Sequence, residues 1–239
     1  MTAPHPVNHQ PGFVLHSHAY KETSLVAELF TRDYGRVAAV ARGARRPLSG
    51  LRGLIQPFHP LLLSWYGRGE LRTLHAAEWQ GGLAPLSGRA LIAGFYLNEL
   101  VLKLLARDDP HEGLYALYDQ TLQSLAAGPG ALEPLLRRFE LGLLKEIGYA
   151  ATLDRLAVSG EPVSAAACYR YQPGHGVVPE DAGAGIAVSG RTLLDLAAGE
   201  FAAPATLGEG KHLMRALIQH HLGGKALYTR LLLQELAEL

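Results

Sequence analysis

The sequence predicts an α+β protein in which a small five-stranded barrel is followed by a mainly α-helical domain. Three observations support this fold class. Short runs rich in valine, leucine and aromatic residues fill the first third of the chain, turn residues separate these runs, and helical periodicity begins after Ser87. We expect a barrel domain at residues 1–80, a helical domain at 81–155 and 190–239, and a loop-rich insertion at 156–189.

Five strands are expected before residue 80. Turns that contain glycine or proline separate the runs at residues 33–35, 42–53 and 67–69. Because several short strands lie this close together in the sequence, we expect a small closed sheet. The last run alternates only in part between apolar and polar residues. The expected strands are 13–16, 24–30, 36–41, 60–66 and 70–76.

Helices are expected in the remaining chain, apart from the insertion. Ser87 is a suitable N-cap, and apolar residues then recur with a helical period. Residues 159–189 are rich in glycine, proline, serine and alanine, with short extended pieces at 168–171 and 186–188. The expected helices are 90–106, 112–127, 133–147, 190–198, 208–221 and 227–239.

The composition excludes several classes of protein. The chain has 239 residues, and 48% of them are hydrophobic, which excludes wholesale disorder. Its one cysteine, Cys168, excludes an internal disulfide framework. The chain has no recognisable secretory signal, and Asn98, Glu99 and Lys103 interrupt its longest apolar helical stretch. We therefore expect a soluble, cytoplasmic protein that does not bind membranes.

Short catalytic motifs are absent. The sequence has no GxxxxGK[ST] loop, no GxGxxG after a strand and no GxSxG. No two of its eleven histidines form a pair that is joined by a well-placed carboxylate or thiolate. We expect Cys168 to be a small buried hydrophobic residue, although a nucleophilic thiol or a histidine pair is the enzymatic alternative. The sequence thus predicts no catalytic residue, no metal ligand and no cofactor.

Positive charge is concentrated in the first third of the chain. Between Arg32 and Arg72 there are eight arginines and only two acidic residues. Arginine binds phosphates in a bidentate manner, and exposed aromatic rings can stack on bases. We therefore expect nucleic-acid binding by Arg36, Arg42, Arg45, Arg46, Arg52, Arg68 and Arg72, with Tyr34, Phe58, Trp65 and Tyr66 as candidate stacking residues. A solvated basic loop with aromatic residues in the core is the alternative.

A second candidate site lies on the helix expected at 133–147. Arg137 and Arg138 interrupt an otherwise apolar pattern that includes Leu141. An arginine at the edge of an apolar groove can receive an acidic or C-terminal peptide, so these three residues are candidates for binding a partner's tail. The alternative is an ion pair with Glu133, Glu140 or Glu146.

Long stretches of the chain resemble the RecO family of bacterial recombination mediators. They include FVLHSHAYKETSLVAELFT at 13–31, the segment 35–78, PLSGRALIAGFYLNELVLKLL at 85–105, LRRFELGLLKEIGY at 136–149, SGEPV at 159–163 and HLGGKALYTR at 221–230. The resemblance covers about four-fifths of the chain, and it rests on the order and coverage of these stretches and not on one motif.

The resemblance implies a function in DNA repair and recombination. It implies an N-terminal OB-fold, binding to single- and double-stranded DNA, annealing of complementary strands and a nucleoid-associated location. The implied partners are the acidic tail of single-stranded-DNA-binding protein and RecR, with which family members load RecA. The family's basic loop corresponds to residues 42–46, and its tail-binding arginine corresponds to Arg137.

The sequence departs from the family pattern at the zinc-knuckle-like region. Some relatives bind zinc with two CxxC pairs, but Leu156 and Ser159 stand at the first pair, and residues 174–181 contain no cysteine. We therefore expect a zinc-less insertion. An RNA-binding or ribosome-associated OB-fold protein is the alternative function, since the same barrel and arginines would serve it.

Overall fold

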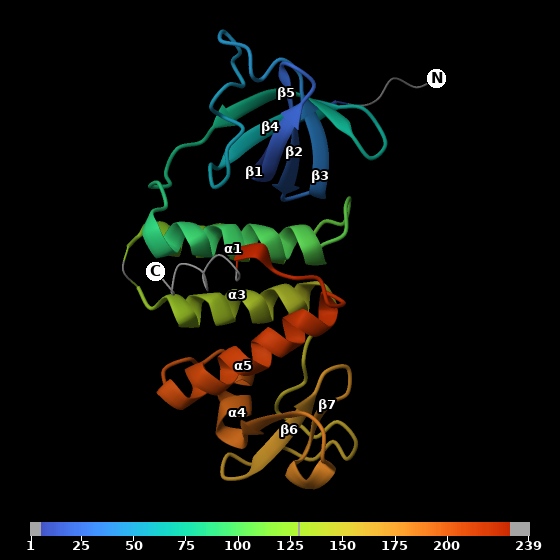
Figure 1. The fold of residues 1–239 in the computed structure, drawn as a ribbon, viewed down its shortest axis with the longest axis vertical. Helices are drawn as coiled ribbons and strands as arrows, with labels where there is room; N and C mark the ends of the chain where they lie inside the picture. The colour runs from blue at the N-terminus through green and yellow to red at the C-terminus, as the bar shows by residue number, and fades with distance from the viewer. Residues whose placement is uncertain (1–5, 129, 230–239) are drawn as a thin grey trace. The chain divides into compact units, whose positions relative to one another are not determined.

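The structure is a computed structural model that describes residues 6–128 and 130–229. The chain divides into two compact units (Figure 1). The first unit contains a barrel, two helices and the segment from Leu227, and the second unit spans Ala131–Ala226. Of the helix expected at 227–239, residues 230–239 lie outside the described residues. The domain boundaries expected from the sequence stay a prediction.

The first unit begins with a closed five-stranded barrel. Its strands are β1 (Val7–Tyr20), β2 (Ser24–Thr31), β3 (Gly35–Ala41), β4 (Leu61–Tyr66) and β5 (Arg72–Trp79). The barrel order is β1-β2-β3-β5-β4, with β3 and β5 parallel and the other pairs antiparallel. Its first strand closes the barrel by pairing with both β2 and β4. The predicted five-stranded, OB-like barrel is confirmed.

The first strand is much longer than the expected run at 13–16. It has two partners, because its N-terminal half pairs with β4 and the rest pairs with β2, with a shift of register at Val14/His16. Gly12 lies where the two pairings meet, and a Cβ atom there would be 2.8 Å from Leu63 Cδ1. Polar residues at both ends of β1 conceal this length in the sequence pattern.

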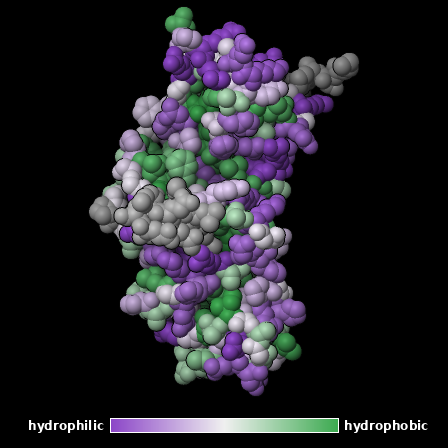
Figure 2. Space-filling view, in the orientation of Figure 1, coloured by the Kyte–Doolittle hydropathy of each residue, from purple (hydrophilic) through white to green (hydrophobic). Residues whose placement is uncertain are grey.

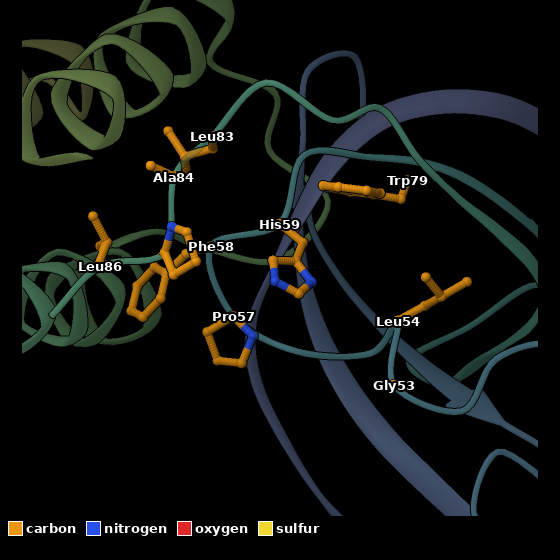
Figure 3. A pocket seen from close by; sticks show the side chains of 10 residues that line it. Gly53, Leu54, Pro57, Phe58, His59, Trp79, Leu83, Ala84 and Leu86 are labelled. Carbon is orange, nitrogen blue, oxygen red and sulfur yellow. The ribbon is translucent and has the colours of Figure 1, made fainter. Parts of the chain in front are cut away.

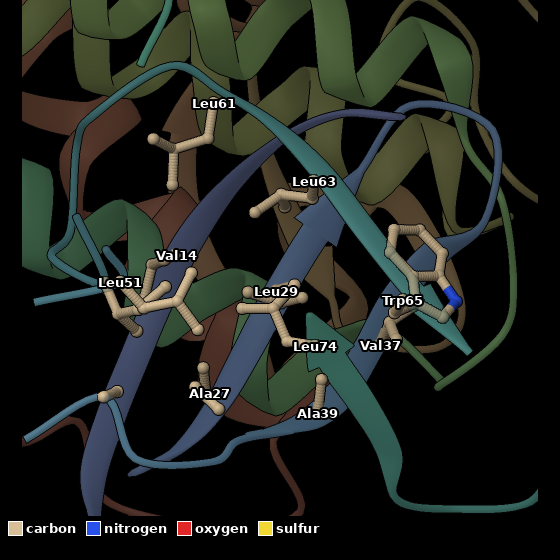
Figure 4. Close-up of a cluster of buried hydrophobic side chains, with 13 residues drawn as sticks. Val14, Ala27, Leu29, Val37, Ala39, Leu51, Leu61, Leu63, Trp65 and Leu74 are labelled. Carbon is tan, nitrogen blue, oxygen red and sulfur yellow. The ribbon is translucent and has the colours of Figure 1, made fainter. Parts of the chain in front are cut away.

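The barrel core is filled by aliphatic side chains and one tryptophan (Figure 4). Leu29 and Leu63 have no solvent exposure, and Trp65 is 2% exposed. Burying a large aliphatic side chain contributes roughly 1.5–3 kcal/mol, so this cluster is a major source of the barrel's stability. Three core residues, Ala44, Leu51 and Ile55, come from the loop after β3 and not from a strand.

Two helices complete the described core of the first unit. They are α1 (Gly88–Leu104) and α2 (Glu112–Ala126), as the periodicity predicts. Asn98 of α1 donates a 2.8 Å hydrogen bond to the carbonyl of Leu15 in β1 and accepts one of 2.5 Å from the Tyr118 hydroxyl of α2. Burial raises the pKa of Tyr118, which keeps this hydroxyl protonated as a donor. One polar network therefore joins the barrel to both helices.

Tyr118→Phe is expected to destabilise the protein by about 1–3 kcal/mol, because it leaves the buried Oδ1 of Asn98 without its donor. Tyr115→Phe is the matched control, since no hydrogen bond of its hydroxyl occurs among the described residues and its ring lies against the same Phe13. Chemical denaturation followed by circular dichroism measures both variants. Equal losses of stability would contradict a specific role for the Tyr118 hydroxyl.

The second unit contains three helices and a small antiparallel sheet. The helices are α3 (Leu132–Glu146), α4 (Gly190–Ala198) and α5 (Pro204–His221). The sheet order is β7-β6-β8, from β6 (Cys168–Gln172), β7 (Gly176–Pro179) and β8 (Ile186–Ser189), with the short 3₁₀ helix η1 (Glu180–Ala182) between β7 and β8. The sequence pattern missed β7, and it placed the start of α5 four residues late. The helix begins at Pro204, because proline suits the first turn of a helix.

Cys168 is exposed, so the expectation that it is buried was wrong. It is the first residue of β6, where its side chain points away from the small sheet's packed side while Tyr169 beside it is buried.

Among the described residues, no helix is both long and apolar enough to span a membrane.

Candidate nucleic-acid interface

The loop after β3, residues 42–60, carries four arginines and no acidic residue. We call these residues the arginine loop. It is a series of tight turns held by short-range hydrogen bonds, such as the 2.9 Å bond from Arg46 N to the Gly43 carbonyl. A bond of 2.9 Å from Arg45 N to the Thr23 carbonyl attaches it to the β1–β2 turn. With Ala44, Leu51 and Ile55 buried in the barrel, the loop's backbone is fixed at several points along its length.

The arginine side chains of this loop lie on its outer side. Arg42, Arg45, Arg46 and Arg52 are all exposed. Arg45 donates to the carbonyl of Glu22 at 3.2 Å, and Arg52 donates to that of Pro47 at 3.5 Å. Within the part of the chain that the structure describes, neither Arg42 nor Arg46 has a side-chain hydrogen bond or an ion pair. Their charge is therefore uncompensated and open to a polyanion.

Two of the seven arginines predicted to bind nucleic acid are partly buried and have partners within the protein, unlike the exposed arginines of the loop. Arg36 is half-buried, lies 3.8 Å from the Glu28 carboxylate and donates to the Leu102 carbonyl. Burial lowers the pKa of Arg36, an effect that Glu28 opposes. Arg72 forms a 2.7 Å ion pair with Asp108, and only 16% of its side chain is exposed. The structure thus gives both residues partners inside the first unit.

Arg68 is the remaining member of the predicted set. It lies in the β4–β5 turn, is exposed, and has no side-chain partner among residues 6–128 and 130–229. Like the exposed arginines of the arginine loop, Arg68 carries an uncompensated positive charge, but it lies in a separate turn of the barrel. Figure 2 shows that the visible surface around the barrel is largely hydrophilic.

The candidate stacking residues divide into two groups. Phe58 and Trp65 are buried, at 7% and 2% exposure, so neither presents a free ring face. Tyr34 and Tyr66 are each 41% exposed, although Tyr34 packs edge-on against Trp65. The most exposed aromatic ring of the barrel is Trp79, at 59%, which the sequence reasoning did not select. Its place at the end of a strand, beside the glycines of residues 81 and 82, was the available signal.

The arginines of α3 occupy two environments. Arg137 is buried and its Nη2 lies 2.6 Å from the carboxylate of Glu140, which has no solvent exposure. This is the ion pair that the sequence analysis held as the alternative. Arg138 is exposed and its guanidinium lies 5.7 Å from the centre of the Phe201 ring. Leu141 is half-buried.

The insertion is held by backbone hydrogen bonds and packing. Leu156 N donates to the Glu161 carbonyl, and Ala157 N donates to that of Val177, both at 2.8 Å. Among the described residues, no group of three or more histidine, cysteine, aspartate or glutamate side chains could hold a metal ion. The positions that would carry the first CxxC pair, Leu156 and Ser159, supply no thiolate.

The barrel order, the exposed arginine loop and the following helical unit define an α+β protein with an OB-like barrel. Two family models match this chain, the recombination protein O N terminal over residues 6–82 and the recombination protein O C terminal over residues 85–230. The chain belongs to the RecO family of DNA repair proteins, which are recombination mediators and not enzymes.

Three relatives show how much of the chain this similarity covers. DNA repair protein RecO of Thiobacillus denitrificans is 58% identical, over 98% of this chain and 94% of the relative. The protein of the same description from Nitrosospira multiformis is 52% identical, over 96% of each chain. That from Laribacter hongkongensis is 52% identical, over 100% of this chain and 99% of its own.

Proposed function

We propose that this protein binds single- and double-stranded DNA without sequence preference and anneals complementary strands. The observation that carries the proposal is the set of exposed arginines on a loop with no acidic residue. Contacts with backbone phosphates release counterions and do not depend on base identity. Neutralising both strands lowers their mutual repulsion, so that complementary bases can meet. Arg42, Arg45, Arg46, Arg52 and Arg68 supply the exposed charge, and Arg36 and Arg72 support the barrel around them.

A titration of labelled oligonucleotides at several salt concentrations tests this proposal. We expect tight binding of both DNA forms that weakens steeply with salt. An RNA competitor tests the alternative function, because a protein made for RNA would release DNA readily when RNA is added. Binding that is insensitive to salt would contradict a mode based on phosphate contacts.

The second part of the proposal is a site for the acidic tail of single-stranded-DNA-binding protein on α3. Arg138 offers an exposed cation, Leu141 offers a partly exposed apolar surface, and Arg137 lies beside them on the same helix. Two linked sites would raise the effective concentration of the mediator at coated strands. RecR is the further proposed partner, which the family membership supports.

Arg138→Ala is expected to weaken binding of an acidic peptide by up to about 1 kcal/mol, or roughly fivefold, as is usual for an exposed charge pair. Calorimetry measures the affinity. Arg191→Ala is the matched control, since Arg191 is an exposed arginine of the same unit that already pairs with Asp195 at 2.8 Å. Equal effects of the two substitutions would place the peptide elsewhere.

A further inference from the structure

An apolar pocket of about 540 Å³ opens on the first unit, beside the end of the barrel (Figure 3). Gly53, Leu54, Phe58 and His59 of the arginine loop line one part of it, and Trp79 ends β5 at its edge. The linker at residues 83–86 forms the other side. In Figure 3, His59 lies between Trp79 and the linker residues Leu83 and Leu86.

Trp79 presents a large aromatic surface to this space. It is 59% exposed, whereas Trp65, the chain's other tryptophan, is 2% exposed. Its nearest ring is that of His59, with 6.4 Å between the ring centroids and an angle of 48°. The tilt leaves the indole unstacked, so a flat ligand can lie against it.

The charge beside the pocket favours an anionic ligand. Arg52 directly precedes Gly53 and Leu54 in the pocket wall, and the arginine loop contains no acid. The acid nearest in sequence to a residue of the pocket wall is Glu78, which directly precedes Trp79. Side chains alternate along a strand, so Glu78 points away from Trp79, and it pairs with His9 at 3.3 Å. Arg52, the exposed residue next to Gly53 in the chain, therefore supplies a cation adjacent in sequence to an apolar pocket with an aromatic wall.

We propose that this pocket receives a nucleobase from single-stranded DNA, stacked on Trp79, while the adjacent phosphates contact Arg52 and its neighbours. A nucleotide combines a flat apolar base with an anionic backbone, which matches the two parts of this site. Bases in a duplex are already paired and stacked, so the pocket takes only unpaired bases. The proposal rests on the proposed DNA binding and adds to it a site that distinguishes single strands from duplexes.

The two tryptophans allow a direct test with a thymidine oligonucleotide. We expect the oligonucleotide to quench the fluorescence of exposed Trp79, while buried Trp65 supplies a constant background. Trp79→Ala is expected to weaken binding of this oligonucleotide roughly 5- to 150-fold, the effect of losing one base–aromatic stack. It should leave the affinity for a blunt-ended duplex of two annealed strands, which has no unpaired base, unchanged. Trp79→Phe keeps a stacking ring and should retain most of the affinity.

Tyr149→Ala is the matched control. Tyr149 is also an exposed aromatic residue, at 52%, but it belongs to the second unit and to no candidate DNA-binding set. An unchanged affinity of Trp79→Ala for the oligonucleotide, or an equal loss for duplex, would overturn the proposal. So would Trp79 fluorescence that changes with protein concentration without DNA, because a second copy would then cover the pocket.

The experiments distinguish a failure of the pocket proposal from a failure of the proposed DNA binding by the arginine loop. If Trp79→Ala has no effect but Arg42→Glu with Arg46→Glu weakens binding, only the pocket is excluded. If the unsubstituted protein binds neither the oligonucleotide nor the duplex, the proposed DNA binding itself is excluded.

Discussion

Reversing two charges, with Arg42→Glu and Arg46→Glu together, is expected to weaken DNA binding roughly 10- to 30-fold near physiological salt. Both side chains are exposed and lack partners among the described residues, so their loss removes the two proposed phosphate contacts without breaking an internal one. Each lost contact lowers the slope of log affinity against log salt by about 0.7 for single strands and about 0.9 for duplex DNA. The slope should therefore fall by roughly 1.4–1.8.

A second pair of substitutions separates this local effect from a change in net charge. Arg155→Glu with Arg215→Glu makes the same change in charge at two exposed arginines of the second unit. We expect a much smaller loss of affinity and an unchanged slope. Fluorescence anisotropy at several salt concentrations gives both quantities. If the slope stays the same in the arginine-loop variant, its two arginines do not contact DNA.

The second large effect is expected at the buried ion pair of α3. Arg137→Met should destabilise the second unit by about 3–5 kcal/mol, because it leaves the Glu140 carboxylate buried without the guanidinium. The double variant Arg137→Met, Glu140→Leu should regain much of this loss, since apolar side chains of similar size can replace a buried pair. Far-UV circular dichroism during urea unfolding measures these changes.

A surface pair in the same unit provides the control. Lys211 and Glu133 also join at 2.8 Å, but their side chains are 57% and 44% exposed. Lys211→Met is therefore expected to cost at most about 1 kcal/mol. Equal losses at the two pairs would contradict the importance of burial. A large loss at Arg137 also means that binding of the acidic peptide by any Arg137 variant must be measured on protein shown to be folded.

Local sequence patterns predicted most elements of the fold. Strands β2, β3 and β4 and helices α1, α2, α3 and α4 lie within two residues of their expected bounds at either end. The pattern failed where pairing is decided by distant residues. It shortened β1, whose two partners differ along its length, and it missed β7, a four-residue strand that follows a glycine-rich turn.

The candidate site was predicted less completely than the fold. The sequence indicated that arginines gather between β3 and β4, and the structure places those side chains on the outer side of the loop. It could not show that Arg72 meets Asp108, because this acid follows α1, far along the chain. Nor could it show that Trp65 faces the core while Trp79 faces solvent, since this depends on the register of β4 and β5.

The three core residues of the arginine loop have an energetic consequence for binding. Ordering a flexible segment costs roughly 1–2 kcal/mol for each residue fixed, and a mobile basic loop would meet this cost whenever a ligand arrived. Here Ala44, Leu51 and Ile55 immobilise the backbone during folding. In the proposed complex the loop would lose only the freedom of its arginine side chains, so most of the ordering cost would come from the polynucleotide, and a flexible single strand loses more freedom than a stiff double helix.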